Sequence, residues 1–349
     1  MIEGDAIKLI EEAIKLNSSD IHILPTKTRY NVYFRTEGQL MPHQQESLDW
    51  GKRLISHLKF LANMDVGEKR RPQSGSASME LEGGTIEIRL STITSVLLLE
   101  SMVIRVLKTR QGLQSHIETF FPQDIEVLRR LTRLKSGLIL FSGPVGSGKT
   151  TTIYQLLRER IQHENLQIIT MEDPVEMYEE RFLQTEVNER AGITYDLLIK
   201  SSLRHHPDIL MIGEIRDEET AKMAVRGALT GHLLIATIHA KNTRGVIARL
   251  QELSVSDEQL RQTIIGIISQ RLVPKLCPQC KNQCSHDCQF IIQSNKRAVL
   301  FELLTGNALN EVLSGKVQLQ QFISLNKKLR KAWAYGFIDS KNYKKFKIF

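Results

Sequence analysis

The sequence predicts an α/β protein made of a larger domain with a mainly parallel sheet and a smaller α+β domain before it. From about residue 121 onward, apolar strand-like runs alternate with helical patterns, which favours a parallel sheet covered by helices. One of these runs leads directly into residues 143–150, where the pattern G-x-x-x-x-G-K-[ST] is complete. Residues 1–108 differ, because period-two strand patterns there are interspersed with two helical patterns.

The first domain begins with an amphipathic helix, since apolar residues between positions 2 and 14 recur at helical spacing on one face. A second helical pattern covers about 48–64. Four strand patterns accompany these helices, at 20–24, 29–35, 85–90 and 102–107. We therefore expect an α+β domain at 1–108.

A polar linker at 109–120 precedes the larger domain, which we place at 121–349. Its last part, about 295–349, is expected to be helical and basic. The strand-like runs of this domain lie at 138–142, 167–171, 209–213 and 233–238. Polar or acidic residues follow each run directly. Because ligands of open α/β sheets bind outside the carboxyl ends of the strands, these segments are expected to converge on one site.

The glycine-rich segment between the first strand and the next helix predicts binding of a nucleoside triphosphate such as ATP. Its glycines let backbone N–H groups turn toward phosphate oxygens. Lys149 is placed to reach the β and γ phosphates, and the hydroxyl of Thr150 to ligate Mg²⁺. The expected phosphate-binding residues are Gly143, Pro144, Val145, Gly146, Ser147, Gly148, Lys149, Thr150 and Thr151.

Acidic residues at the ends of the other strands supply candidates for hydrolysis. Phosphoryl transfer to water needs a metal ion and a positioned water. Glu214 ends its strand, but Gly213 stands where P-loop enzymes ordinarily have a metal-binding Asp. Glu172, Asp173 and Glu176 are the other candidates, and either Glu176 or Glu214 is expected to activate the water while the other holds Mg²⁺ through its hydration shell. The alternative is that these acids only cap helices.

Two histidines, His232 and His239, bracket the strand at 233–238. A lone histidine is more often structural than functional. His239 follows the carboxyl end of the strand and is therefore the one expected to contact the γ phosphate, while His232 is a weaker candidate for nucleotide binding.

The net charge of +8 is concentrated at the end of the chain. Residues 321–349 carry eight Lys or Arg against Asp339 alone, a net of +7, so the other residues carry about +1. This region either docks on an acidic partner or anionic lipid, or is a solvated helix face. No apolar run is long enough to span a membrane and no signal peptide is evident, so we expect a cytoplasmic protein with at most a peripheral relation to the membrane.

All four cysteines fall within 277–288. In a cytoplasmic chain such a cluster favours a metal site over disulfides. Cys277 and Cys280 form a C-x₂-C pair, and Cys284 and Cys288 follow at wider spacing. A structural Zn²⁺ is the favoured interpretation, with reduced thiols packed in a loop as the alternative.

Taken together, the motifs resemble those of the secretion traffic ATPases, the motors of type II secretion and type IV pili. The segments at 172–176, 207–217 and 230–239 look like the Asp box, Walker B region and His box of that family. Residues 19–22 and 67–73 look like motifs of the family's second N-terminal domain. The resemblance covers essentially the whole chain.

This resemblance implies a RecA-like P-loop NTPase domain preceded by a PAS-like α+β domain, assembled as a homohexamer. Arg89 and Arg105 match the positions from which the N-terminal domain sends arginines to the γ phosphate. The implied partner is a polytopic platform protein of the membrane, and the implied product is a fibre of pilin-like subunits.

Within the family, the cysteine cluster and the segments at 297–304 and 335–338 are similar to the members that serve DNA uptake in Gram-positive bacteria. Contact with DNA would then be indirect, through the machine that the motor builds. Three alternatives stay open: a motor of another pilus or secretion system, a DNA-stimulated P-loop translocase that uses the basic C-terminal region, and a regulatory protein that binds ATP without turnover.

Overall fold

The computed structural model describes residues 2–16, 18–36, 39–81, 84–107, 117–280, 296–315 and 322–348. The chain forms two compact units. The first comprises Met1–Leu113 with Glu176–Tyr178, and the second comprises Gln114–Val175 with Glu179–Phe349. Most of the predicted linker at 109–120 lies outside the described residues.

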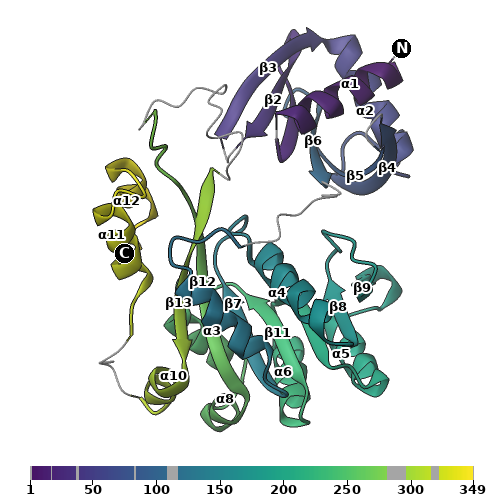
Figure 1. Ribbon diagram of the computed structural model, residues 1–349. Coiled ribbons are helices and arrows are strands. Elements are labelled where there is room, and N and C mark those ends of the chain that lie inside the picture. Colours follow the sequence, from purple (N-terminus) through teal and green to yellow (C-terminus); the bar gives the residue numbers. More distant parts are fainter. Residues whose placement is uncertain are drawn as a thin grey trace. The chain divides into compact units, whose positions relative to one another are not determined.

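The first unit is an antiparallel six-stranded sheet packed against two helices, α1 (Ile2–Lys15) and α2 (Leu48–Leu61) (Figure 1). The strand order is β3-β2-β1-β6-β5-β4. The strands are β1 (Asp20–Pro25), β2 (Arg29–Thr36), β3 (Gln39–Ser47), β4 (Gln73–Leu81), β5 (Gly84–Thr94) and β6 (Glu100–Leu107). Buried residues of both helices and of the sheet form one apolar core, which makes this unit an α+β domain as the sequence predicts.

The second unit is a seven-stranded sheet in the order β13-β12-β7-β11-β10-β8-β9, with only β13 antiparallel to its neighbour. Its strands are β7 (Gly137–Ser142), β8 (Ile168–Glu172), β9 (Leu183–Glu186), β10 (Ile209–Ile215), β11 (Leu233–Ile238), β12 (Ile264–Pro274) and β13 (Arg297–Thr305). Every residue of β7, β8 and β11 is buried, because helices lie on both faces of the sheet (Figure 1). The predicted α/β class with a mainly parallel sheet is confirmed.

Helices of the second unit connect and cover these strands. They are α3 (Gln123–Thr132), α4 (Lys149–His163), α5 (Tyr195–Ser202), α6 (Glu218–Leu229), α7 (Thr243–Glu252), α8 (Asp257–Thr263), α10 (Gly306–Leu313), α11 (Leu325–Ala334) and α12 (Ser340–Phe346). No helix among the described residues combines the length and apolar character that crossing a bilayer requires.

The end of the chain differs from the sequence expectation in two respects. The region about 295–349 contains a strand, β13, because its apolar run pairs with Gly266–Pro274 of β12. Its charge is also partly internal, since Lys328 of α11 is buried and donates to both carboxylate oxygens of Asp124 at 2.6 Å. Lys328 is therefore not part of a solvated basic surface.

Candidate active site

The glycine-rich segment forms the turn from β7 into α4. Gly143 has φ 147°, and a Cβ atom there would lie 2.5 Å from the carbonyl oxygen of Gln270 and 2.8 Å from Ser147 Oγ. Only glycine fits this approach between the loop and β12. The Nζ atom of Lys149 donates to the carbonyls of Gly143 at 3.0 Å and Pro144 at 3.3 Å. The loop thus wraps around the ammonium group of Lys149, the first residue of α4. A cation and free backbone N–H groups at the start of a helix are what a phosphate-binding loop requires.

Gln270 of β12, a residue outside the predicted site, supports this loop from inside the domain. Its side chain is fully buried, and its Nε2 donates to the carbonyl oxygen of Ser147 at 2.7 Å. The next residue, Arg271, donates to the carbonyls of Gln270 and Lys241. The local signal is a polar run, Ser269 to Arg271, inside a mostly apolar strand.

Replacement of Gln270 by leucine is expected to lower both thermal stability and nucleotide affinity. The leucine keeps the volume but leaves the buried Ser147 carbonyl without its donor, which costs about 1–3 kcal/mol. Calorimetric unfolding and titration with a fluorescent ATP analogue measure the two effects. Gln262→Leu, the same change at an exposed position of α8, is the control. If Gln270→Leu matches wild type in both measurements, Gln270 does not position the loop.

An acidic and basic cluster lies at the carboxyl ends of β10 and β11. Glu214 Oε1 lies 3.0 Å from His239 Nε2, and Glu214 Oε2 accepts from Arg216 Nε at 2.6 Å. Arg216 also donates from Nη1 to Asp173 Oδ2 at 3.0 Å, so it joins the ends of β8 and β10. The structure therefore brings together Glu214, His239 and Asp173 as the sequence analysis expected, and adds Arg216.

The charge of Arg216 is fixed by this cluster. The hydrogen bond with Glu214 raises the pKa of Arg216 further above its usual range, with Asp173 contributing in the same direction. Arg216 is consequently protonated throughout the physiological pH range, and in the structure its guanidinium lies between the two carboxylates. Strands β7, β11 and β10 are adjacent in the sheet, so the phosphate loop and this cluster follow the carboxyl ends of neighbouring parallel strands.

Position 213 has no room for a side chain, which explains its glycine. A Cβ atom on Gly213 would lie 2.9 Å from the hydroxyl oxygen of Tyr195 and 3.0 Å from the carbonyl oxygen of Met171. The place of an Asp side chain is therefore filled by the hydroxyl group of Tyr195 in α5 and by the backbone of β8. Burial raises the pKa of Tyr195, and the nearby Asp173 adds to this effect, so the tyrosine remains neutral.

Glu172, the last residue of β8, points into the interior. Its side chain is buried, and Oε1 accepts from the hydroxyl of Tyr154 at 2.5 Å and from Thr170 Oγ1 at 2.8 Å. The bond from Tyr154 ties β8 to α4, and the two bonds together hold Oε1 of this carboxylate in the interior. Glu176 lies further on, exposed in the segment between β8 and β9.

His232 lies at the opposite edge of the sheet from the phosphate loop. Its carbonyl oxygen accepts from the N–H of Gly137 at the start of β7, and its ring lies 3.2 Å from Thr230 Oγ1. The whole of β11, six residues, separates it from His239; at 3.3 Å per residue the strand spans about 20 Å. We therefore leave His232 out of the nucleotide site.

In the first unit, Arg89 and Arg105 are direct cross-strand neighbours on β5 and β6. Arg105 Nε donates to Asp20 Oδ1 at 2.9 Å, yet its side chain is 57% exposed. Burial raises the pKa of Asp20, but hydrogen bonds from Ser19 and Arg105 outweigh it and hold this pKa below its usual value. Asp20 thus holds Arg105 in a partly exposed position, opposite the half-buried Arg89 on the neighbouring strand.

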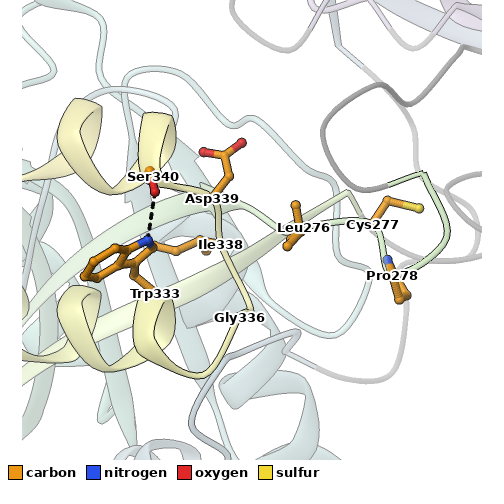
Figure 2. Close-up of a pocket in the computed structure, with 8 residues that line it drawn as sticks. All are labelled: Leu276, Cys277, Pro278, Trp333, Gly336, Ile338, Asp339 and Ser340. Carbon is orange, nitrogen blue, oxygen red and sulfur yellow. Dashed lines mark hydrogen bonds between the residues drawn. The ribbon is translucent and has the colours of Figure 1, made fainter.

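Of the cysteine cluster, Cys277 and Cys280 lie in the described part of the chain, whereas Cys284 and Cys288 lie outside it. The backbone N–H of Cys280 donates to Cys277 Sγ at 3.4 Å, so the chain turns tightly around the first sulfur. Figure 2 shows Cys277 and Pro278 lining a pocket with residues of the C-terminal helices, among them Trp333. No potential metal-binding group is present among the described residues, and zinc is therefore unconfirmed.

Comparison with known proteins gives matches along nearly the whole chain. The family model described as "Type II/IV secretion system protein" matches residues 1–345. "Competence protein ComGA" of Bacillus subtilis (strain 168) is 40% identical over 345 residues, which cover 98% of this chain and 97% of the relative. The protein of that name from Halalkalibacterium halodurans is 42% identical over 347 residues, 98% of each chain.

Solved structures agree with this result. The pilus retraction motor PilT, solved with bound ADP, is 27% identical with a TM-score of 0.69, and the match covers 98% of this chain and 96% of that one. The ATPase DotB of Legionella pneumophila has a TM-score of 0.73 at 20% identity, covering 97% and 93% of the two chains. The likeness to DotB supports the RecA-like fold alone.

Proposed function

Because this chain belongs to the type II/IV secretion system protein family, we propose that it is a traffic ATPase whose ATP hydrolysis drives assembly of the pilus of a DNA-uptake machine. The near full-length identity to two competence proteins supports the competence role. The observation that carries the enzymatic part is the contact of Glu214 with His239 and Arg216 at the sheet edge that also holds the phosphate loop.

In this proposal the loop residues 143–151 hold the triphosphate. The close contact of Gly143 with β12 and the position of Lys149 against the loop carbonyls fit a loop that binds phosphate. The hydroxyl of Thr150 at the start of α4 is the proposed protein ligand for Mg²⁺. Bound Mg²⁺ supplies charge neutralisation at the β and γ phosphates. Lys149 exchanges its loop carbonyls for phosphate oxygens, which places its charge where negative charge develops.

We assign different roles to the two glutamates from their contacts. One carboxylate oxygen of Glu214 already faces the Arg216 guanidinium and the other a ring nitrogen of His239, so this side chain suits a fixed position beside the hydrated metal. Glu176 is exposed and is proposed as the base that takes the proton of the attacking water. His239 lies 3.0 Å from Glu214, so we propose that it contacts the γ phosphate and couples the presence of that phosphate to the position of Glu214.

The N-terminal domain, 1–108 in this proposal, supplies Arg89 and Arg105 to the γ phosphate when it closes about the linker. Their cross-strand pairing supports joint action, because two adjacent guanidinium groups match the oxygens of one phosphate. Closure of the N-terminal domain when ATP binds, and its opening after hydrolysis, would convert each turnover of ATP into movement of that domain.

The proposed assembly is a homohexamer on the cytoplasmic face of the membrane, working on a polytopic platform protein. Capture of the tagged full-length protein from membranes, followed by identification of its partner, tests this assignment. Enrichment of a polytopic protein of a competence locus supports it. Enrichment of the platform of another pilus or secretion system would reassign the chain to that machine.

Contact with DNA is proposed to be indirect. Part of the basic C-terminal charge is internal, since Lys328 pairs with Asp124, and this weakens the case for a DNA-binding surface there. Single-stranded and duplex DNA should therefore leave ATP hydrolysis unchanged at moderate salt. Salt-sensitive stimulation by either DNA would favour the translocase alternative.

We also propose a structural Zn²⁺ held by Cys277, Cys280, Cys284 and Cys288. The N–H to sulfur contact at Cys277 supports it, because such a turn presents a thiolate with its charge partly satisfied. Purified protein should contain about one equivalent of zinc per chain by elemental analysis. Replacement of Cys277 and Cys280 by serine should remove the metal, and less than about half an equivalent in wild type would contradict the proposal.

A further inference from the structure

The turn between β5 and β6 exposes three consecutive apolar side chains. Val96, Leu97 and Leu98, which we call the apolar tip, have exposed fractions of 100%, 39% and 72%. The turn is well formed, since the N–H of Leu98 donates to the Ser95 carbonyl at 3.0 Å and the N–H of Ser95 to the Leu99 carbonyl at 2.9 Å. The apolar side chains are thus held outward by a defined hairpin.

The backbone at the apolar tip is strained. Leu98 has φ 54°, in the left-handed region where a side chain with a Cβ atom is disfavoured and glycine is the usual residue. A leucine that is both strained and exposed adds nothing to the core of its own unit. Its side chain is therefore best explained by a contact outside that unit.

A basic segment adjoins the apolar tip in the same unit. Lys69, Arg70 and Arg71, which we call the basic loop, are exposed. The Thr94 hydroxyl at the end of β5 donates to the carbonyl of Lys69. The register of β4 and β5, with Gln73 opposite Thr92, places the basic loop beside the strand end that carries the tip.

The two segments are joined by a buried lysine. Lys59 of α2 is fully buried, and its Nζ donates to the carbonyl of Glu68 at 2.6 Å and to Glu100 Oε1 at 2.8 Å. Glu68 precedes the basic loop and Glu100 begins β6, just after the tip. The carboxylate of Glu68 also accepts from the backbone N–H groups of Arg70 and Arg71, which fixes the shape of the loop.

We propose that the apolar tip and the basic loop together form a docking surface for an anionic lipid bilayer. The tip would enter the boundary between headgroups and acyl chains. Lys69 and Arg70 would contact lipid phosphates, together with Arg71, whose exposed guanidinium also lies 3.9 Å from the carboxylate of Glu68. A single shallow apolar contact binds membranes weakly, whereas an apolar contact joined to a polybasic patch binds them stably. The charge next to the tip therefore favours an anionic bilayer over an apolar protein groove.

The test is co-sedimentation of the full-length protein with vesicles of phosphatidylcholine alone or of phosphatidylcholine and phosphatidylglycerol in equal parts. Wild type should bind the anionic vesicles and not the neutral ones, with binding lost at high salt. Charge reversal of Lys69, Arg70 and Arg71 to glutamate should weaken binding by about two orders of magnitude. The double substitution Val96→Ser and Leu98→Ser should weaken it on the order of tenfold.

Leu98→Gly separates docking from folding. Glycine relieves the positive φ, so thermal stability should be equal to or higher than that of wild type while vesicle binding falls. Leu16→Ser, an exposed leucine at the end of α1, is the matched control and should leave binding unchanged.

Wild-type binding by the tip variants would overturn the proposal. So would a change of oligomeric state in Leu98→Gly, measured by light scattering, with unchanged vesicle binding, because the tip would then be a contact between copies of the chain. ATP hydrolysis without vesicles is a separate readout, so this proposal and the ATPase assignment can fail independently.

Discussion

Replacement of Lys149 by alanine is expected to abolish ATP hydrolysis. The lysine is the one cation that the phosphate-loop pattern itself supplies, and its Nζ already lies against the loop carbonyls of Gly143 and Pro144. Losing a charge aimed at the transferred phosphate costs about two to three orders of magnitude in turnover. Steady-state phosphate release with Mg²⁺ and ATP measures this loss.

The matched control for this variant is Lys135→Ala, the same change at an exposed lysine just before β7. It should retain wild-type turnover, and both variants should unfold at the wild-type temperature. Wild-type turnover by purified Lys149→Ala would refute the assignment of the loop as the active site.

Glu176→Gln and Glu214→Gln should each lose most of the turnover while retaining nucleotide. Glutamine keeps the shape of the side chain but neither accepts a proton nor carries the charge that a hydrated metal needs, and loss of a general base alone costs about 10²–10⁴-fold. The two variants should differ in their response to Mg²⁺. Glu214→Gln is expected to need more Mg²⁺ for its residual activity, whereas Glu176→Gln should keep the wild-type requirement.

Glu218→Gln, an exposed glutamate of α6, is the control for these variants and should behave as wild type. Binding is measured by titration with a fluorescent ATP analogue. Failure of both active-site variants to bind ATP would show that these glutamates support the fold instead of the chemistry. An unchanged Mg²⁺ requirement in Glu214→Gln would reverse the two roles.

The parallel strands of the second unit were predictable because helices cover both faces of the sheet, which makes β7, β11 and the first four residues of β10 mostly apolar and buried. Edge strands β3 and β4 were not predicted. Most residues of β3 are exposed or half-buried, and β4 begins with a polar Ser- and Gly-rich run, so neither shows a clear apolar alternation.

The site was predictable where function follows from position along one strand, and unpredictable where it depends on packing between strands. Glu214 and His239 could be located because each follows a recognisable strand. Glu172 has the same kind of position, but its carboxylate turns inward to Tyr154, a partner eighteen residues earlier. Gln270 reaches the phosphate loop from β12, a strand that the sequence analysis did not identify, and a hydrogen bond across 123 residues leaves no local pattern.

The central claim is that hydrolysis at this site drives pilus assembly. It is tested most directly by the amount of pilin-like subunit in fibres sheared from cells whose only copy of the protein is Glu176→Gln. The account predicts that these cells contain the variant at wild-type abundance, with ATP bound, and yield no fibres, while cells with Glu218→Gln yield the wild-type amount. Wild-type fibre levels with Glu176→Gln, in protein shown to have lost ATP hydrolysis, would contradict the account.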